Sequence, residues 1–205
     1  VINGQQTFIG ITTNAGKARF QGLEFEGNAL LARSFGTEGD SLNFSWSLGY
    51  INADYLEFID ARGIDVADRR NIQNTPRWTA SGTLNYGVPM AGGTLNLIGQ
   101  VSYRSRTSQF ELPAEGLDQP GYALFDASIV WRSSDDRWSI GLHGKNLFDE
   151  RYVTSGYVFL SQNPDTGVYN RNAAGSLIPT LGGEGILTAY YGNPRQAYVT
   201  VGLNF

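Results

Sequence analysis

Residues 42–50 read Leu-Asn-Phe-Ser-Trp-Ser-Leu-Gly-Tyr, and large apolar side chains alternate there with small or polar ones. A period of two predicts a β-strand with one apolar and one polar face. No stretch carries a convincing amphipathic helix. The same alternation recurs in residues 23–31, 78–86, 95–104, 123–131, 138–143 and 197–205. The sequence therefore predicts an all-β chain of about seven strands.

The connections between these strands alternate in length. Short ones are expected at residues 36–40, 87–93 and 133–136, and long ones at residues 59–75, 108–121 and 161–192. This alternation is typical of an outer-membrane barrel. We therefore expect an antiparallel up-and-down transmembrane β-barrel, present in part. Residues 1–11 are interpreted as the outer end of one more strand, which gives about seven to eight strands.

The direction of the apolar face separates two classes of protein. A lipocalin-like barrel or a soluble β-sandwich with a small apolar ligand would turn this face inward. Three features favour an outward, lipid-facing direction: no charge among the apolar-face residues at strand centres, an opposite face of Ser, Thr, Asn, Gln and Gly, and aromatic residues near strand ends. The aromatic residues are Tyr50, Trp78, Tyr86, Tyr103, Trp131 and Trp138.

Composition argues against most other functions. The chain has 205 residues, 17% of them charged, and a net charge of −4, which disfavours nucleic-acid binding. It has no Cys and a single His, so disulfides, thiol nucleophiles and Cys or His metal sites are not expected. His143 is the one candidate general base, and Glu24 and Glu26 could form a carboxylate pair. We interpret all three as lining a polar lumen, with the glutamates paired to Arg of neighbouring strands. We expect no enzyme activity, catalytic residue, cofactor or metal site.

Four motifs carry a resemblance to a known family. The chain resembles the C-terminal part of the β-barrel of TonB-dependent outer-membrane receptors, from about Asn14 to its end. The motifs are Gly22-Leu23-Glu24-Phe25-Glu26, then Asn74-Thr75-Pro76-Arg77, then Asn146-Leu147-Phe148-Asp149 followed by Tyr152, and finally Gly192-Asn193-Pro194-Arg195 with the alternating run to Phe205. We interpret these positions as structural rather than ligand-binding.

The resemblance implies a barrel of about 22 strands that is occluded by a plug domain. Residues 1–205 would then be the C-terminal part of that barrel, a truncated or excerpted receptor without its plug. The implied function is TonB-dependent active uptake of a scarce substrate across the bacterial outer membrane. A ferric siderophore is the expected substrate, and cobalamin, haem and oligosaccharides stay open. The implied partners are membrane lipid, the plug, the TonB complex and, through Phe205, the barrel-insertion machinery.

Four arginines are the candidate substrate contacts: Arg69, Arg70, Arg104 and Arg106. A guanidinium binds carboxylate or phosphate groups through two parallel hydrogen bonds, which suits an anionic siderophore. The alternative is a solvated loop, in which Asp60, Arg62, Asp65 and Asp68 pair locally with these arginines. Aromatic residues near the last long connection could stack on a ligand or complete an aromatic girdle. A complete eight-stranded barrel that acts as a binding or structural protein also stays open.

Overall fold

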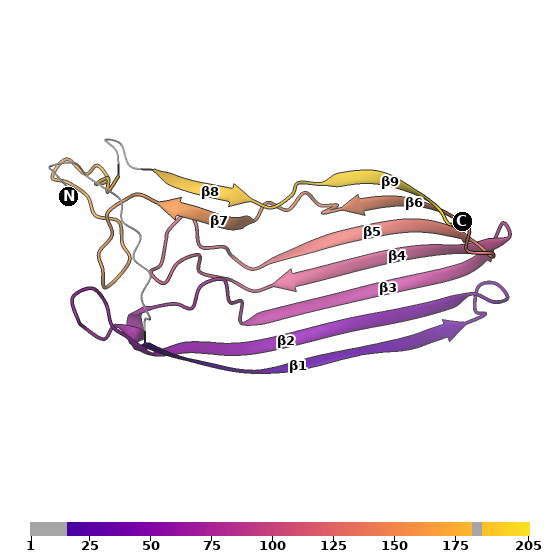
Figure 1. Cartoon of the computed structure of the whole chain (residues 1–205), viewed down its shortest axis with the longest axis horizontal. Helices are drawn as coiled ribbons and strands as arrows, with labels where there is room; N and C mark the ends of the chain where they lie inside the picture. The colour runs from indigo at the N-terminus through magenta and orange to yellow at the C-terminus, as the bar shows by residue number, and fades with distance from the viewer. Residues whose placement is uncertain (1–15, 182–185) are drawn as a thin grey trace.

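The computed structural model describes residues 16–181 and 186–205, and its regular secondary structure is almost entirely β-strand (Figure 1). The strands are β1 (Gly16–Arg33), β2 (Ser41–Phe58), β3 (Trp78–Met90), β4 (Gly93–Arg104), β5 (Tyr122–Ser133), β6 (Trp138–Lys145), β7 (Val153–Val158), β8 (Leu187–Tyr191) and β9 (Gln196–Leu203). One short 3-10 helix, η1 (Ala67–Arg69), interrupts the connection between β2 and β3. In the described part of the chain no helix is long and apolar enough to cross a membrane.

Seven strands form one antiparallel sheet in the order β1-β2-β3-β4-β5-β6-β9. The short turns and the C-terminus lie at one end of this sheet, and the long connections lie at the other (Figure 1). This confirms the predicted up-and-down, all-β architecture. The sheet is open, because β1 and β9 lack a strand partner on their outer sides within the described residues. The predicted additional strand at residues 1–11 lies outside the described residues.

The last long connection differs from the prediction. β7 and β8 form a separate two-stranded sheet, so the last five residues before Gly192 are strand rather than loop. Figure 1 shows β7 continuing the line of β6, and β8 that of β9. Asn146 and Asp149 adopt positive φ angles of 48° and 56°, which break the strand between β6 and β7. The sequence pattern missed β8 because a strand of five residues offers too few alternations.

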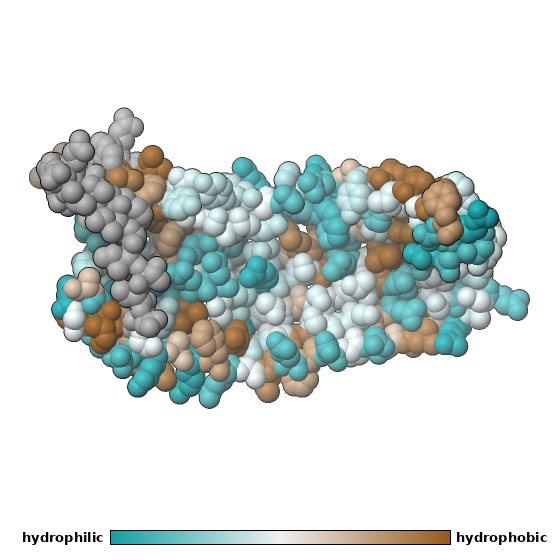
Figure 2. All heavy atoms as spheres, viewed as in Figure 1, coloured by the Kyte–Doolittle hydropathy of each residue, from teal (hydrophilic) through white to brown (hydrophobic). Residues whose placement is uncertain are grey.

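The register of the sheet places the apolar side chains in continuous rows on one face. Leu142, for example, lies between Ile129 of β5 and Val199 of β9. No described residue covers these rows: Leu142 is 52% exposed and Val201 67% exposed. Figure 2 shows apolar side chains at the surface near the end that carries the C-terminus. A soluble sandwich would bury this face, so the exposure favours the lipid-facing direction.

The aromatic residues at the strand ends lie where a girdle would require them. At the end with the long connections, the rings of Tyr50 and Trp78 lie 4.6 Å apart. At the end with the short turns, Trp131 donates through Nε1 to the carbonyl of Met90 at 3.0 Å, and Trp138 is 47% exposed. Two aromatic bands therefore bracket the apolar rows.

Candidate functional site

The three long connections pack against one another in a layer that we call the loop cap, defined as residues 59–77, 105–121 and 159–181. All buried hydrophobic side chains of the described residues lie here: Val66, Ala114, Leu117 and Leu160. Each of the three connections contributes at least one of them. The cap is therefore a folded unit with a small core of its own.

Hydrogen bonds between the connections reinforce this core. The Asn71 N–H donates to the Glu111 carbonyl at 2.8 Å, which joins the first connection to the second. Gln162 donates through Nε2 to the Pro113 carbonyl at 2.9 Å, which joins the third to the second. The cap can thus present side chains from distant parts of the sequence in fixed positions.

A cavity of about 700 Å³ lies where β2 and β3 meet the loop cap. Its volume is within the range of small-molecule sites, about 300–1,000 Å³. Polar and charged side chains dominate its lining. The lining residues are Ile51, Ala53, Asp54, Arg70, Asn71, Ile72, Thr75, Arg77, Trp78, Ser105, Arg106, Thr107, Ser108, Pro113 and Asp118.

Three arginines and two aspartates set the charge of this cavity. The Arg106 guanidinium lies 3.5 Å from the Asp118 carboxylate, and Arg77 donates to Oδ1 of Asn52 at 3.3 Å. Both contacts are long for hydrogen bonds of a guanidinium. Arg70 donates to the Pro164 carbonyl at 2.8 Å, and its guanidinium carbon lies 5.6 Å from the centre of the Phe58 ring. Each guanidinium has five N–H donors, so most of them stay free for a ligand. The excess of positive charge suits an anion.

The structure separates the four predicted arginines into two groups. Arg70 and Arg106 line the cavity, whereas Arg69 and Arg104 do not. Arg69 is engaged within the cap by two ion pairs. The pair with Asp68 is the local Asp–Arg pairing of the predicted alternative, whereas the pair with Asp165 joins another connection. Arg104 ends β4, opposite Thr79, and forms no ion pair with any residue of 16–181 or 186–205. Their contact with substrate stays a prediction.

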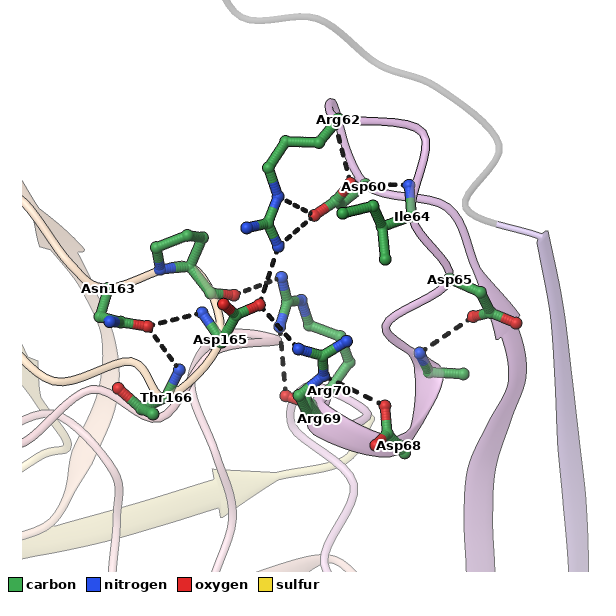
Figure 3. Close-up of polar contacts among 12 residues, drawn as sticks. Asp60, Arg62, Ile64, Asp65, Asp68, Arg69, Arg70, Asn163, Asp165 and Thr166 are labelled. Carbon is green, nitrogen blue, oxygen red and sulfur yellow. Dashed lines mark hydrogen bonds and ion pairs between the residues drawn. The ribbon is translucent and has the colours of Figure 1, made fainter.

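Asp165 clamps the first and third connections together (Figure 3). Its Oδ1 accepts from Arg62 at 2.8 Å and from Arg69 at 2.7 Å, residues more than ninety positions away. The hydrogen bond from Arg62 is the main reason why the pKa of Asp165 lies below its ordinary value. Asn163 accepts the N–H groups of Asp165 and Thr166 at 2.9 and 3.1 Å, which fixes the turn that presents the carboxylate.

Sequence reasoning did not identify Asp165 or the role of Arg77 in the cavity. The signal for Asp165 was present in Asn163-Pro164-Asp165-Thr166-Gly167, a composition typical of a tight turn. Arg77 was interpreted only as part of a strand-entry motif. Neither partner of Asp165 could be inferred, because both belong to another connection.

The motif around Asn146 forms the break between β6 and β7. Asn146 is 5% exposed, and its Nδ2 donates to the carbonyls of Glu150 and Asn193 at 2.9 and 3.1 Å. Asp149 accepts the N–H of Arg195 at 2.9 Å, which links this break to the entry of β9. The ring of Tyr152 stacks on that of Tyr122 at 4.5 Å. These contacts go to backbone and neighbouring rings rather than toward the cavity.

The other candidate catalytic groups lie on the polar face of the sheet. His143 lies 2.9 Å from the Ser128 hydroxyl and 3.0 Å from that of Thr200. Glu24 and Glu26 lie opposite Gly49 and Ser47, and the expected pairing with Arg is absent among the described residues. The reason is positional, since neither facing residue carries a charge. Within the described ranges no three acidic or His side chains are grouped to hold a metal ion.

Comparison with known proteins gives a consistent family. The family described as "TonB dependent receptor-like, beta-barrel" matches residues 1–147. The pesticin receptor of Yersinia enterocolitica is 29% identical over 161 residues, which cover 76% of this chain and 20% of that protein. The ferric-pyoverdine M114 receptor PbuA of Pseudomonas sp. strain M114 is 27% identical over 197 residues, which cover 94% of this chain and 19% of that protein.

The fold has a counterpart among solved structures. The crystal structure of the ferric yersiniabactin uptake receptor FyuA from Yersinia pestis matches with a TM-score of 0.63 at 21% identity, covering 94% of this chain and 24% of that one. The chain thus spans about a fifth of the length of its curated relatives. Those relatives are named as receptors, not enzymes. The family match, the sheet of up-and-down strands and the exposed apolar rows agree, and the chain belongs to the TonB-dependent receptor-like β-barrel family.

Proposed function

We propose that this chain is the C-terminal part of the barrel of a TonB-dependent receptor that takes up a ferric siderophore. Residues 1–205 supply barrel wall, polar lumen surface and ligand-capturing loops, and the plug lies elsewhere in a longer protein. The short overlap with much longer receptors supports this reading over a complete eight-stranded barrel. Among the described residues, β1 and β9 have open edges, which support it too, since lipid does not tolerate unpaired strand edges.

The observation that carries the proposal is the arginine-lined cavity beneath the loop cap. The cavity volume of about 700 Å³ accommodates part of a ferric chelate. Arg70, Arg77 and Arg106 offer hydrogen-bond donors to its anionic oxygen atoms. Two relatives are named for ferric ligands, pyoverdine and yersiniabactin. We assign Arg77, with Arg70 and Arg106, to substrate contact, and keep Arg69 and Arg104 as candidates that would act after a rearrangement of the cap.

The location and partners follow from the same proposal. The apolar rows would face the lipid of the bacterial outer membrane, with the loop cap outside and the short turns at the periplasmic side. The plug would fill the barrel and contact TonB, which supplies the energy from the inner membrane. Phe205, an exposed residue just beyond β9, would contact the barrel-insertion machinery.

An oligosaccharide substrate finds less support in the site. Sugars are commonly bound by stacking on several aromatic rings. Trp78 is the one aromatic side chain among the lining residues that the structure describes, and the aromatic residues of the last connection cluster elsewhere. Tyr157 lies 6.0 Å from both Phe159 and Tyr190, ring centre to ring centre, and none of the three lines the cavity. Tyr157 and Tyr190 are half exposed, as expected for an aromatic girdle.

The test is ligand binding by the intact receptor, measured by quenching of its Trp fluorescence. We expect ferric siderophores that carry a net negative charge to bind, and Arg77→Gln and Arg106→Gln to weaken binding by about tenfold each. Arg132→Gln, at the opposite end of the sheet, is the matched control. Tight binding of a glycan with no binding of any ferric chelate would overturn the proposal.

A further inference from the structure

A small hollow on the apolar face of the sheet shares no lining residue with the arginine-lined cavity. We call this hollow the wall groove, and its volume is about 260 Å³. Its floor is a row of three small residues that lie opposite one another on adjacent strands, Ala127 of β5, Gly144 of β6 and Ala197 of β9. The side chain of Leu147 lies over Gly144 in the middle of this floor, where a Cβ would be 2.6 Å from its Cδ2, and Ile129 and Leu142 border the hollow. The lining residues are Ala127, Ile129, Leu142, Gly144, Leu147 and Ala197, with Ser128 and His143, whose side chains point to the opposite, polar face.

The groove belongs to the face that carries the exposed apolar rows. The next row along the same strands consists of Ile129, Leu142 and Val199, which are 47%, 52% and 65% exposed. Because side chains alternate in direction along a strand, the floor residues point to the same side as this row. The hollow is therefore a missing piece of an otherwise continuous apolar surface.

A cationic side chain stands at the upper end of the groove. The guanidinium of Arg195 donates to the carbonyl of Leu147 at 3.5 Å, and the side chain of Leu147 lines the groove. Arg195 is exposed and forms no ion pair with another described residue, although the Asp149 carboxylate accepts its backbone N–H. Beside Leu147, the exposed ring of Phe148 packs edge-on against Phe125 at 4.9 Å. The groove is thus apolar along its length and positive at one end.

The depth of Arg195 agrees with a membrane interface. Eight residues separate it from Leu203, which is ~26 Å along a strand at about 3.3 Å per residue. With a strand tilt of about 40°, this corresponds to ~20 Å along the membrane normal, close to the ~25 Å height of an apolar band. Arg195 would therefore lie where acyl chains give way to headgroups.

We propose that the wall groove binds one acyl chain of a membrane lipid whose anionic headgroup is held by Arg195. The inference rests on the proposed membrane location of the chain but not on any substrate. The two ends of such a lipid match the two parts of the site, an apolar trough and, at interface depth, a cation that has no ion pair among the described residues. A neutral apolar molecule would leave the guanidinium unused, and a flat protein surface would leave the hollow unfilled.

The test uses the full receptor in nanodiscs that contain equal amounts of phosphatidylglycerol and phosphatidylcholine. Lipid that remains bound after release is counted by native mass spectrometry. We expect the wild type to retain phosphatidylglycerol preferentially. Ala197→Phe should fill the trough and remove most of the retained lipid, whereas Val201→Phe, on the same strand and face but outside the groove, should leave it unchanged. Ala127→Leu fills the trough from a different strand and guards against a folding defect of the first variant.

Arg195→Gln tests the headgroup contact, and Arg132→Gln serves as its control. We expect Arg195→Gln to weaken retention of phosphatidylglycerol by about fivefold and to abolish the preference over phosphatidylcholine. If Ala197→Phe and Val201→Phe retained equal amounts of lipid, or if the wild type retained none, the proposal that the wall groove binds an acyl chain would be wrong. Unchanged preference in Arg195→Gln overturns the assignment of the anionic headgroup. A receptor that retains lipid in this pattern yet binds no ferric chelate would refute the proposed substrate and leave the lipid site standing.

Discussion

The strand wall and the loop cap of this chain are stabilised in different ways. The strands of the wall are joined by long ladders of backbone hydrogen bonds, and side chains are exposed on both faces of the sheet. On β1, for example, Phe25 is 61% exposed on one face, and Glu24 is exposed on the other. The cap has little regular structure but contains all the buried hydrophobic side chains of the described residues. The comparison teaches that the wall depends on its surroundings, whereas the cap has a core of its own.

The largest expected effect comes from the core of the cap. Leu117 is 1% exposed, so Leu117→Ala should lower the free energy of local unfolding of the cap by about 2–5 kcal/mol through cavity formation. Leu97→Ala in the wall, where the side chain is 39% exposed, is the control. Hydrogen exchange of the reconstituted receptor should show loss of protection in the cap only. Equal losses for both variants would remove the distinction between the two regions.

The second effect concerns the apolar face of the wall. Val199 lies near the middle of the apolar rows of β9, and Thr200 points to the opposite face. Val199→Arg should cost about 2–4 kcal/mol of free energy of folding into the membrane, while Thr200→Arg should cost little. Folding titrations into lipid vesicles measure both. If Thr200→Arg were the more damaging change, the assignment of the two faces would be reversed.

A smaller effect is expected at a glycine in the cap. Gly167 has a φ of 74°, and a Cβ there would lie 2.7 Å from the Pro113 carbonyl oxygen. Gly175 has a φ of 80° but open space around it, so Gly175→Ala carries the backbone strain alone. Gly167→Ala should therefore destabilise the cap by more than the about 1–2 kcal/mol expected for Gly175→Ala. Protease cleavage of the cap in intact receptor would rank the two variants.

The smallest effect is the dependence of the clamp on pH. The pKa of Asp165 in the folded cap lies below its ordinary value, because Arg62 donates a hydrogen bond to the carboxylate. The stabilisation of the cap by this carboxylate is therefore complete above the unfolded pKa of about 3.9. It is lost as the pH falls through the lower, folded pKa. Spin labels at Ala61→Cys and Ala173→Cys should move apart below about pH 4. In Asp165→Asn the separation should not change with pH, and a persistent pH response would place the switch elsewhere.

The fold was predictable because its signal is local. Alternation within each strand, as in residues 42–50, required no knowledge of the rest of the chain, and the contrast of short turns with long connections gave the topology. β8 escaped because five residues give too little periodicity, and a break at Asn146 and Asp149 needs backbone angles that the sequence pattern does not reveal.

The candidate site was predictable only in part, because it is assembled from distant segments. Arginines were recognised as suitable for an anion, and Arg70 and Arg106 do line the cavity. Residue type alone could not show that Arg69 is occupied by Asp165, 96 positions away, or that Arg77 of the strand entry faces the same space. Pairing between loops depends on how the loops fold over one another.

The order of strands in the main sheet has a consequence for the order of folding. Every pairing from β1 to β6 joins neighbours in sequence, so each can close as a hairpin with little loss of chain entropy, apart from those that span a long connection. β9 pairs with β6 across some fifty intervening residues, those that form β7, β8 and part of the loop cap. The C-terminal strand should therefore be the last of these seven to join, and the cap should already be compact when it does.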